Sequence, residues 1–157
     1  MNEEMRKKLV EMLEVKTRQS QEASRQRQQA RIDLNAFHSR VADVLDEIVV
    51  PVLEEFAKQL NAWGRQSRVL VNHEEGHPPY LTLYVQNEGI PFDIQVADHV
   101  RISPSAEIDK ILVDERILDL HGSAPSKSQA RHFPLAEITR EKVEQMVFEF
   151  VQRLIGA

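Results

Sequence analysis

The stretch LNAFHSRVADVLDEIVVPVLEEFAKQLNAWG (residues 34–64) decides the fold, because it is the main apolar segment of the chain. Its apolar residues recur every three or four positions, a spacing that predicts a helix with one buried stripe. The stripe consists of Leu34, Phe37, Val41, Val44, Leu45, Ile48, Val52, Phe56, Leu60 and Trp63. Pro51 lacks a backbone N–H and disfavours helical geometry at Val50, so we expect a kinked helix or two nearly collinear helices. Gly64 suits the end of this helix.

Upstream of this segment, residues 2–50 contain neither glycine nor proline and are rich in strong helix formers, which predicts a long N-terminal helical arm over residues 1–33. A coiled-coil seam runs through it in steps of four and three, through Leu9, Leu13, Ala23, Ala30 and Leu34. The seam is polar at Lys16, Ser20 and Arg27, and residues 16–31 offer little to bury. This segment therefore pairs as a coiled coil, serves as a solvated connector or is partly disordered, and all three alternatives stay open here.

Downstream of Gly64 the apolar period changes from helical to two, which predicts half-buried strands. The segments are SRVLVN (67–72), YLTLYVQN (80–87), PFDIQVADHVRI (91–102) and, less regular, KILVDERILDLH (110–121). In the third segment we expect Phe92, Ile94 and Val96 on one face. The short connections favour antiparallel hairpins and a sheet of about four to five strands. Residues 122–131, GSAPSKSQAR, have the composition of a mobile loop.

A final helix is predicted after Thr139, which is a good N-cap residue, and Ile138 and Val143 fit the two ends of a hydrophobic staple. Its apolar stripe consists of Val143, Val147, Phe150, Val151 and Leu154. The order of helices, sheet and helix predicts an α+β fold in which the C-terminal helix packs on an antiparallel sheet. We expect two parts: the arm at 1–33 and an α+β body at 34–157.

The composition is that of a soluble protein, with 41% hydrophobic and 29% charged residues and a formal net charge of −5. The charge is unevenly distributed: residues 16–40 hold six basic and two acidic side chains, whereas residues 41–157 hold 11 basic and 19 acidic ones. No segment approaches the roughly 20 apolar residues that span a bilayer. The chain has no cysteine, which excludes disulfides and thiolate chemistry. We expect a cytoplasmic protein without a membrane partner.

The segment NHEEGHPPY (72–80) places His73, Glu74, Glu75 and His77 close together, as a metal or catalytic site would. Gly76 and the two prolines exclude the helix on which an HExxH motif would lie. Glycine and proline are instead the residues that a turn between two strands needs. We expect a solvated loop with no metal and no catalytic role.

The other polar residues form no recognised catalytic motif. His38, His99, His121 and His132 are scattered, and Asp114, Glu115, Asp119 and His121 are more simply explained by a charged edge strand. No phosphate-binding glycine loop and no GxSxG motif is present. We expect no cofactor.

The basic part of the arm could contact phosphates through Arg25, Arg27 and Arg31. It contains no aromatic residue on which a base could stack, and a pI near 5.7 opposes nonspecific phosphate binding. A solvated helix face, or one that meets an acidic partner, is the favoured interpretation, and nucleic acid is disfavoured.

The leading functional hypothesis is a non-enzymatic, self-associating scaffold or chaperone-like protein that acts through interaction surfaces. We expect a homodimer formed through Leu34, Phe37, Val41, Val44 and Ile48, because the apolar band of the long helix is wider than a one-sided surface helix needs. A protein client is a further expected partner. A nucleic-acid-associated regulator using residues 16–31, and an enzyme or ligand binder using the histidine and carboxylate loops, are the alternatives. The acidic body, the element order and the expected dimer loosely resemble bacterial secretion chaperones, although the long arm departs from that pattern and no residue roles are carried over.

Overall fold

The computed structural model describes residues 1–87, 89–118 and 127–156. It contains two units, Met1–Ala36 and Phe37–Ala157, and each is treated by itself below. The first unit is helical; it contains the arm expected at residues 1–33, and from here on the name arm refers to Met1–Ala36. The second, called the body, is an α+β fold with an antiparallel sheet and a C-terminal helix, which confirms the predicted fold class.

Three helical elements follow one another without a loop. They are α1 (Glu3–Val44), a π-helical turn η1 (Leu45–Val49) and α2 (Val50–Ala62). The Val50 N–H donates to the Leu45 carbonyl, five residues earlier, which is the hydrogen bond of a π-bulge. Pro51 lies in the first turn of α2, where its missing N–H costs least. The interruption predicted at Pro51 is therefore a π-bulge immediately before the proline.

Five strands follow in a simple meander, with each strand antiparallel to the next. They are β1 (Ser67–Asn72), β2 (Tyr80–Val85), β3 (Asp98–Pro104), β4 (Lys110–Ile117) and β5 (Lys127–Pro134), in the sheet order β1-β2-β3-β4-β5. A short 3-10 turn η2 (Leu135–Glu137) leads into α3 (Arg140–Gly156). The Lys142 N–H donates to the Thr139 hydroxyl at 3.2 Å, which confirms Thr139 as the cap of this helix. Gly64, with φ of +84°, ends the turn after α2 as expected.

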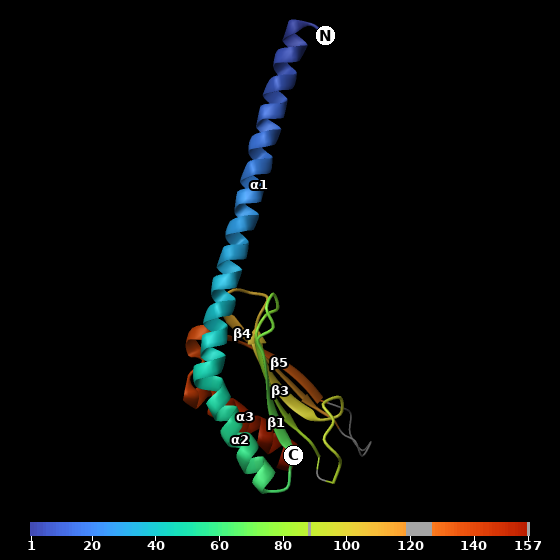
Figure 1. The fold of residues 1–157 in the computed structure, drawn as a ribbon, viewed down its shortest axis with the longest axis vertical. Coiled ribbons are helices and arrows are strands. Elements are labelled where there is room, and N and C mark those ends of the chain that lie inside the picture. The colour runs from blue at the N-terminus through green and yellow to red at the C-terminus, as the bar shows by residue number, and fades with distance from the viewer. Residues whose placement is uncertain (88, 119–126, 157) are drawn as a thin grey trace. The chain divides into compact units, whose positions relative to one another are not determined.

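The body packs its helices on one face of the sheet (Figure 1). The core lies between the sheet and the helices, where Leu81, Leu83 and Val85 of β2 meet the buried stripes of the helices. From the helical run it includes Phe37, Val41, Leu45, Val49, Val52, Leu53 and Leu60, and from α3 it includes Val143, Met146, Val147 and Phe150. The α2 helix lies against β1 and β2, and α3 contacts β3. No helix of the described residues lies on the other face of the sheet (Figure 1).

Three local expectations were wrong. Residues 92–97 are not a strand: they form a turn before β3, in which Ile94 is exposed and the Val96 and Ala97 N–H groups donate to the Asp93 carbonyl. Residues 127–131 are not a loop but the first part of β5, since β4 offers them a free edge; residues 122–126 lie outside the described residues. Trp63 does not join the buried stripe, because α2 ends just before it.

Candidate functional site

The body has an apolar groove of about 960 Å³ between α2 and α3. It is lined by Phe56, Leu60, Trp63, Phe148, Val151 and Ile155, with Glu55, Gln59, Arg65, Glu141, Glu144 and Gln145 around them. Trp63 is 83% exposed, and Phe148 and Ile155 are also exposed. Large exposed aromatic and aliphatic side chains that surround one groove mark an interaction surface more often than isolated exposed residues do.

The rim of this groove is acidic and is bridged by one cation. Arg140 donates from Nε to Glu144 at 2.8 Å and from Nη2 to Glu55 on α2 at 3.2 Å. The hydrogen bond to Glu144, the charge of that carboxylate and the charge of Glu55 raise the pKa of Arg140. Counting Arg65 and Arg140 against Glu55, Glu141 and Glu144 leaves one net negative charge at the rim.

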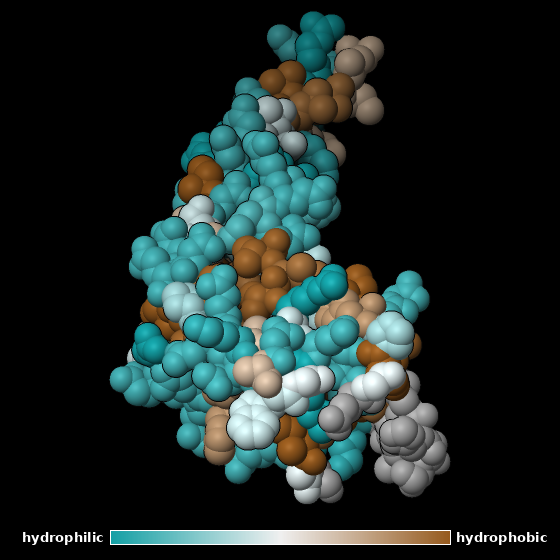
Figure 2. Space-filling model, turned by 60° about the horizontal axis from the view of Figure 1, so that its bottom comes forward, coloured by the Kyte–Doolittle hydropathy of each residue, from teal (hydrophilic) through white to brown (hydrophobic). Residues whose placement is uncertain are grey.

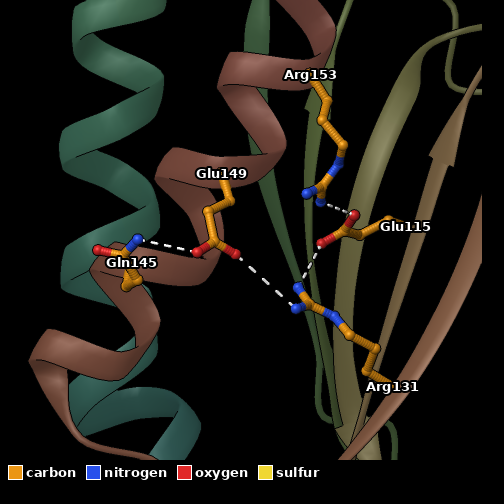
Figure 3. A network of polar contacts seen from close by, with 5 residues as sticks. All are labelled: Glu115, Arg131, Gln145, Glu149 and Arg153. Carbon is orange, nitrogen blue, oxygen red and sulfur yellow. Dashed lines mark hydrogen bonds and ion pairs between the residues drawn. The ribbon is translucent and has the colours of Figure 1, made fainter.

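A polar cluster on the helix-facing side of the sheet joins β4, β5 and α3 (Figure 3). The carboxylate of Glu115 on β4, with its side chain 4% exposed, accepts from Arg131 Nη2 of β5 at 3.1 Å and from Arg153 Nη2 of α3. Arg131 Nη1 also lies 3.9 Å from Glu149 of α3. The cluster holds two carboxylates and two guanidiniums, so its charges balance. Its role is to hold α3 on the sheet, because a buried carboxylate that loses its cations is strongly destabilising.

The helix-free face of the sheet is covered in part by its own long side chains. Arg101 donates to the Thr82 and Tyr84 hydroxyls at 3.0 and 3.1 Å, and its guanidinium lies 4.8 Å from the centre of the Tyr80 ring. Thr82 and Tyr84 are consequently buried, although this strand face was expected to be wet. Burial, followed by the positive charges of Arg116 and Arg101, lowers the pKa of the neighbouring His99 to about 4.

The histidines of the NHEEGHPPY segment do not converge. His73 Nε2 lies 2.9 Å from the Asp46 carboxylate, whereas His77 Nε2 lies 4.0 Å from Glu74 within its own turn. His132 Nδ1 lies 3.2 Å from the Ser105 hydroxyl, and burial lowers the pKa of His38. Within residues 1–87, 89–118 and 127–156, no group of three or more His, Asp or Glu side chains is placed to hold a metal ion.

The carboxylates of residues 113–121 also separate, and the expectation of an edge strand here was wrong, because β4 lies between β3 and β5. Glu115 points to the helix-facing side and Asp114, its neighbour on β4, to the other side, because side chains alternate along a strand. Asp119 and His121 lie outside the described residues. Arg25 pairs with Glu22 of the same helix at 3.4 Å, while Arg27 and Arg31 are exposed on the arm.

The residues expected to mediate self-association have different environments. Phe37 and Val41 have no exposed surface, because the body of the same chain covers them, and Val44 and Ile48 are partly buried against the same core. Leu34 is 37% exposed. Self-association through this set stays a prediction, and Leu34 is its most exposed member.

Sequence reasoning missed two features. The Glu115 cluster gave no motif, since its members come from three separate elements. The groove gave a partial signal: Phe148 and Ile155 lie outside the buried stripe predicted for the last helix, and an apolar residue off the stripe is exposed when the helix packs on one side only.

Comparison with family models, curated proteins and solved structures gave no match. Among the described residues, no helix combines the length and apolar character needed to cross a bilayer.

Proposed function

We propose that the protein is a self-associating interaction module whose arm pairs with the arm of a second copy. The observation that carries this proposal is an exposed apolar stripe on the arm. Met5, Leu9, Met12 and Leu13 are all exposed, by 43% to 68%. At 3.6 residues per turn these four positions span an arc of roughly 100°, the width of a stripe that a helix normally buries.

The apolar seam is weak in the middle of the arm because the side chains there are polar. Between Lys16 and Gln29 almost every side chain is polar, and Ala23 alone is partly covered. Figure 2 shows this contrast, with brown side chains near the far end of the arm and teal ones along its middle. An isolated helix gains little stability by itself, so packing against a partner is what would hold the arm. Burying four such side chains on each of two arms supplies about 12–24 kcal/mol before association costs of about 4–15 kcal/mol. A dimer in the micromolar range needs about 8 kcal/mol net, which this burial can supply.

The test is a pair of double variants with the same change of charge and similar loss of apolar surface. Leu9→Glu/Leu13→Glu places two carboxylates on the stripe, whereas Val10→Glu/Val15→Glu places them on other faces of the same helix. The readout is pyrene or spin-label proximity between arms at an introduced Gln19→Cys, which is unique because the chain has no cysteine.

We expect arm proximity in the otherwise unchanged protein and in the Val10→Glu/Val15→Glu control at tens of micromolar, on the order of the weakest dimer that the burial allows. It should be lost in Leu9→Glu/Leu13→Glu. Arm pairing would be contradicted if the labels at Gln19→Cys show no proximity in any of the three proteins. It would also be contradicted if both double variants lose the proximity equally.

A second candidate function is recruitment of a client protein by the groove between α2 and α3. Its apolar floor and acidic rim match an amphipathic helix with basic flanks, the arrangement of helix-in-groove recognition.

Trp63 is the only tryptophan and lines the groove, so its fluorescence reports on occupancy of the groove. A synthetic Leu/Lys amphipathic helix should shift the emission to the blue and a Leu/Glu helix should not. Phe148→Glu/Ile155→Glu should abolish the response, and equal binding of both peptides would contradict this candidate.

A further inference from the structure

The free edge of β1 differs from the opposite edge of the sheet. Strand β5 carries Lys127, Pro134 and an inward-pointing Arg131, which are the features that protect an edge strand from pairing with another chain. Strand β1, SRVLVN, has no proline and no lysine, and Leu70 and Val71 are 43% and 42% exposed. Arg68 is its one charged side chain, and its guanidinium lies over the Phe92 ring. An edge strand with two exposed apolar residues and so little protection is a template for a further strand.

The hydrogen-bond pattern identifies which backbone groups of β1 are open. The Gln86 N–H donates to the Gln66 carbonyl at 2.8 Å, and the register continues as Arg68 opposite Tyr84, Leu70 opposite Thr82 and Asn72 opposite Tyr80. Bonded and non-bonded pairs alternate along an antiparallel ladder. The residues between these therefore turn their N–H and C=O groups away from β2, and they are Ser67, Val69 and Val71.

Ser67 already has a partner. The Asn61 side chain accepts from the Ser67 N–H at 2.8 Å and donates to the Ser67 carbonyl at 3.0 Å, so the last turn of α2 closes this end of the edge. Nothing among the described hydrogen bonds reaches the outward groups of Val69 and Val71. Two donors and two acceptors therefore remain along a short segment.

We propose that β1 pairs antiparallel with β1 of a second copy about a two-fold axis at Leu70. In this register Val69 bonds to Val71 of the partner subunit and Val71 bonds to Val69 of the partner subunit, so all four open groups are satisfied by one another. Shifting the register by one pair would direct a bond to Ser67, which Asn61 occupies, or to the residue after the strand. The two five-stranded sheets become one continuous sheet.

Side-chain chemistry favours a second copy over an unrelated strand. Leu70 faces its own symmetry mate across a non-hydrogen-bonded pair, where side chains lie closest. Val69 faces the partner's Val71 on the helix-covered side, a β-branched pair of the kind that stabilises sheets. Arg68 faces the partner's Asn72, so no like charges meet. Each exposed apolar residue of the strand gains an apolar neighbour, and the surface is self-complementary.

The test uses single cysteines in the full-length chain, which has none of its own. In the proposed register the two Leu70 Cα atoms lie about 4.5 Å apart, within disulfide range. The two Arg68 Cα atoms lie four residues out of register, roughly 13 Å apart, which is too far. Leu70→Cys is therefore the reporter and Arg68→Cys the matched control, on the same face of the same strand. Oxidised glutathione accepts the electrons from the two thiols.

We expect Leu70→Cys to form a covalent dimer at least about tenfold faster than Arg68→Cys, because only the first pair meets disulfide geometry. The same result is expected in the Leu9→Glu/Leu13→Glu background, which separates this interface from arm pairing. Equal rates of disulfide formation by the two cysteine variants would overturn β1 pairing. The absence of a covalent dimer would also overturn it, and this is the result expected if a strand of another protein occupies the edge. If Leu70→Cys forms the disulfide in the otherwise unchanged protein but not in the Leu9→Glu/Leu13→Glu background, β1 pairing would depend on the arm. That result would also overturn the proposal.

Discussion

At the scale of single residues, the most consequential contact in the body is the pairing of Glu115 with two arginines. A carboxylate buried between β4 and α3 is tolerated because Arg131 and Arg153 supply its hydrogen bonds and its counter-charge. Such a cluster adds specificity of placement more reliably than net stability, since desolvation of the ions offsets much of their attraction. The same three positions filled with apolar residues would meet no desolvation cost.

We therefore expect Arg131→Met/Arg153→Met to lower the free energy of unfolding by about 3–5 kcal/mol, because Glu115 is left buried without a cation. Adding Glu115→Met should restore most of this loss. Urea unfolding followed by circular dichroism measures both steps. Arg140→Met, which removes an exposed arginine from the groove rim, serves as the control and should leave the midpoint unchanged. A triple variant no more stable than the double would refute the account.

His99 is the residue through which the body should respond to pH. Its pKa in the folded protein is about 4, below the ordinary 6.5, because the site is buried and faces Arg116 and Arg101. Well above pH 6.5 the histidine is neutral in both states and contributes nothing. As the pH falls from 6.5 towards 4, the unfolded chain takes up a proton that the folded protein refuses, so stability is lost across this interval.

The loss attributable to His99 is up to about 3 kcal/mol, because folding lowers its pKa from 6.5 to about 4. His99→Gln cannot titrate, so its stability should decline less between pH 6.5 and 4 than that of the unchanged protein. Burial raises the pKa of the adjacent Asp98, so its protonation favours the folded state as the pH falls. This contribution is present in both proteins and cancels in the comparison. Parallel stability curves over this interval would show that His99 is not the responsive group.

At the scale of elements, one helical run serves two purposes. Up to Ala36 all of its side chains except Ala23 are exposed, whereas from Phe37 its apolar stripe enters the core of the body. The π-bulge at Leu45–Val49 inserts an extra residue into the helical repeat, and both Leu45 and Val49 remain buried. Apolar residues on either side of Pro51 thus face the same sheet despite the proline.

A truncated variant that begins at Asp33 should remain folded, because residues 1–32 contribute no buried side chain. We expect its free energy of unfolding to differ from that of the full chain by less than about 0.5 kcal/mol. Phe37→Ala in the full chain provides the contrast, with a loss of about 3–5 kcal/mol from the core. Calorimetry of the three proteins measures both effects. A truncated variant without a cooperative transition would show that the arm is part of the fold.

At the scale of the whole molecule, the arm and the body carry charges of opposite sign. The arm, residues 1–36, has eight basic and six acidic side chains, and residues 37–157 have 12 basic and 19 acidic ones. An acidic body repels phosphates, which opposes the alternative of a nucleic-acid-associated regulator. Apolar seams and backbone pairing respond weakly to salt, whereas phosphate contacts weaken steeply with it.

Raising the salt concentration tenfold should therefore change the self-association constant by less than roughly threefold, since neither proposed interface depends on charge pairs. Binding to DNA through Arg25, Arg27 and Arg31 would instead fall by nearly three orders of magnitude, about 0.9 decade for each phosphate contact. Sedimentation equilibrium measures the first and fluorescence anisotropy with a labelled duplex the second. Tight DNA binding with this salt slope would favour the nucleic-acid alternative over self-association.

The sequence by itself determined the helical arm, the change to strand periodicity after Gly64, the cap at Thr139 and the α+β class. These follow from local spacing and from residues whose backbone preferences are strong. Only the tertiary structure decided that Phe37 and Val41 belong to the body, that residues 92–97 form a turn and that residues 127–131 form an edge strand. It also decided that Glu115, Arg131 and Arg153 meet and that Val69 and Val71 keep open backbone groups. Such features depend on which distant segments of the chain become neighbours. The period of apolar residues along the sequence, two or 3.6, identifies a buried face but does not identify the segment that covers it.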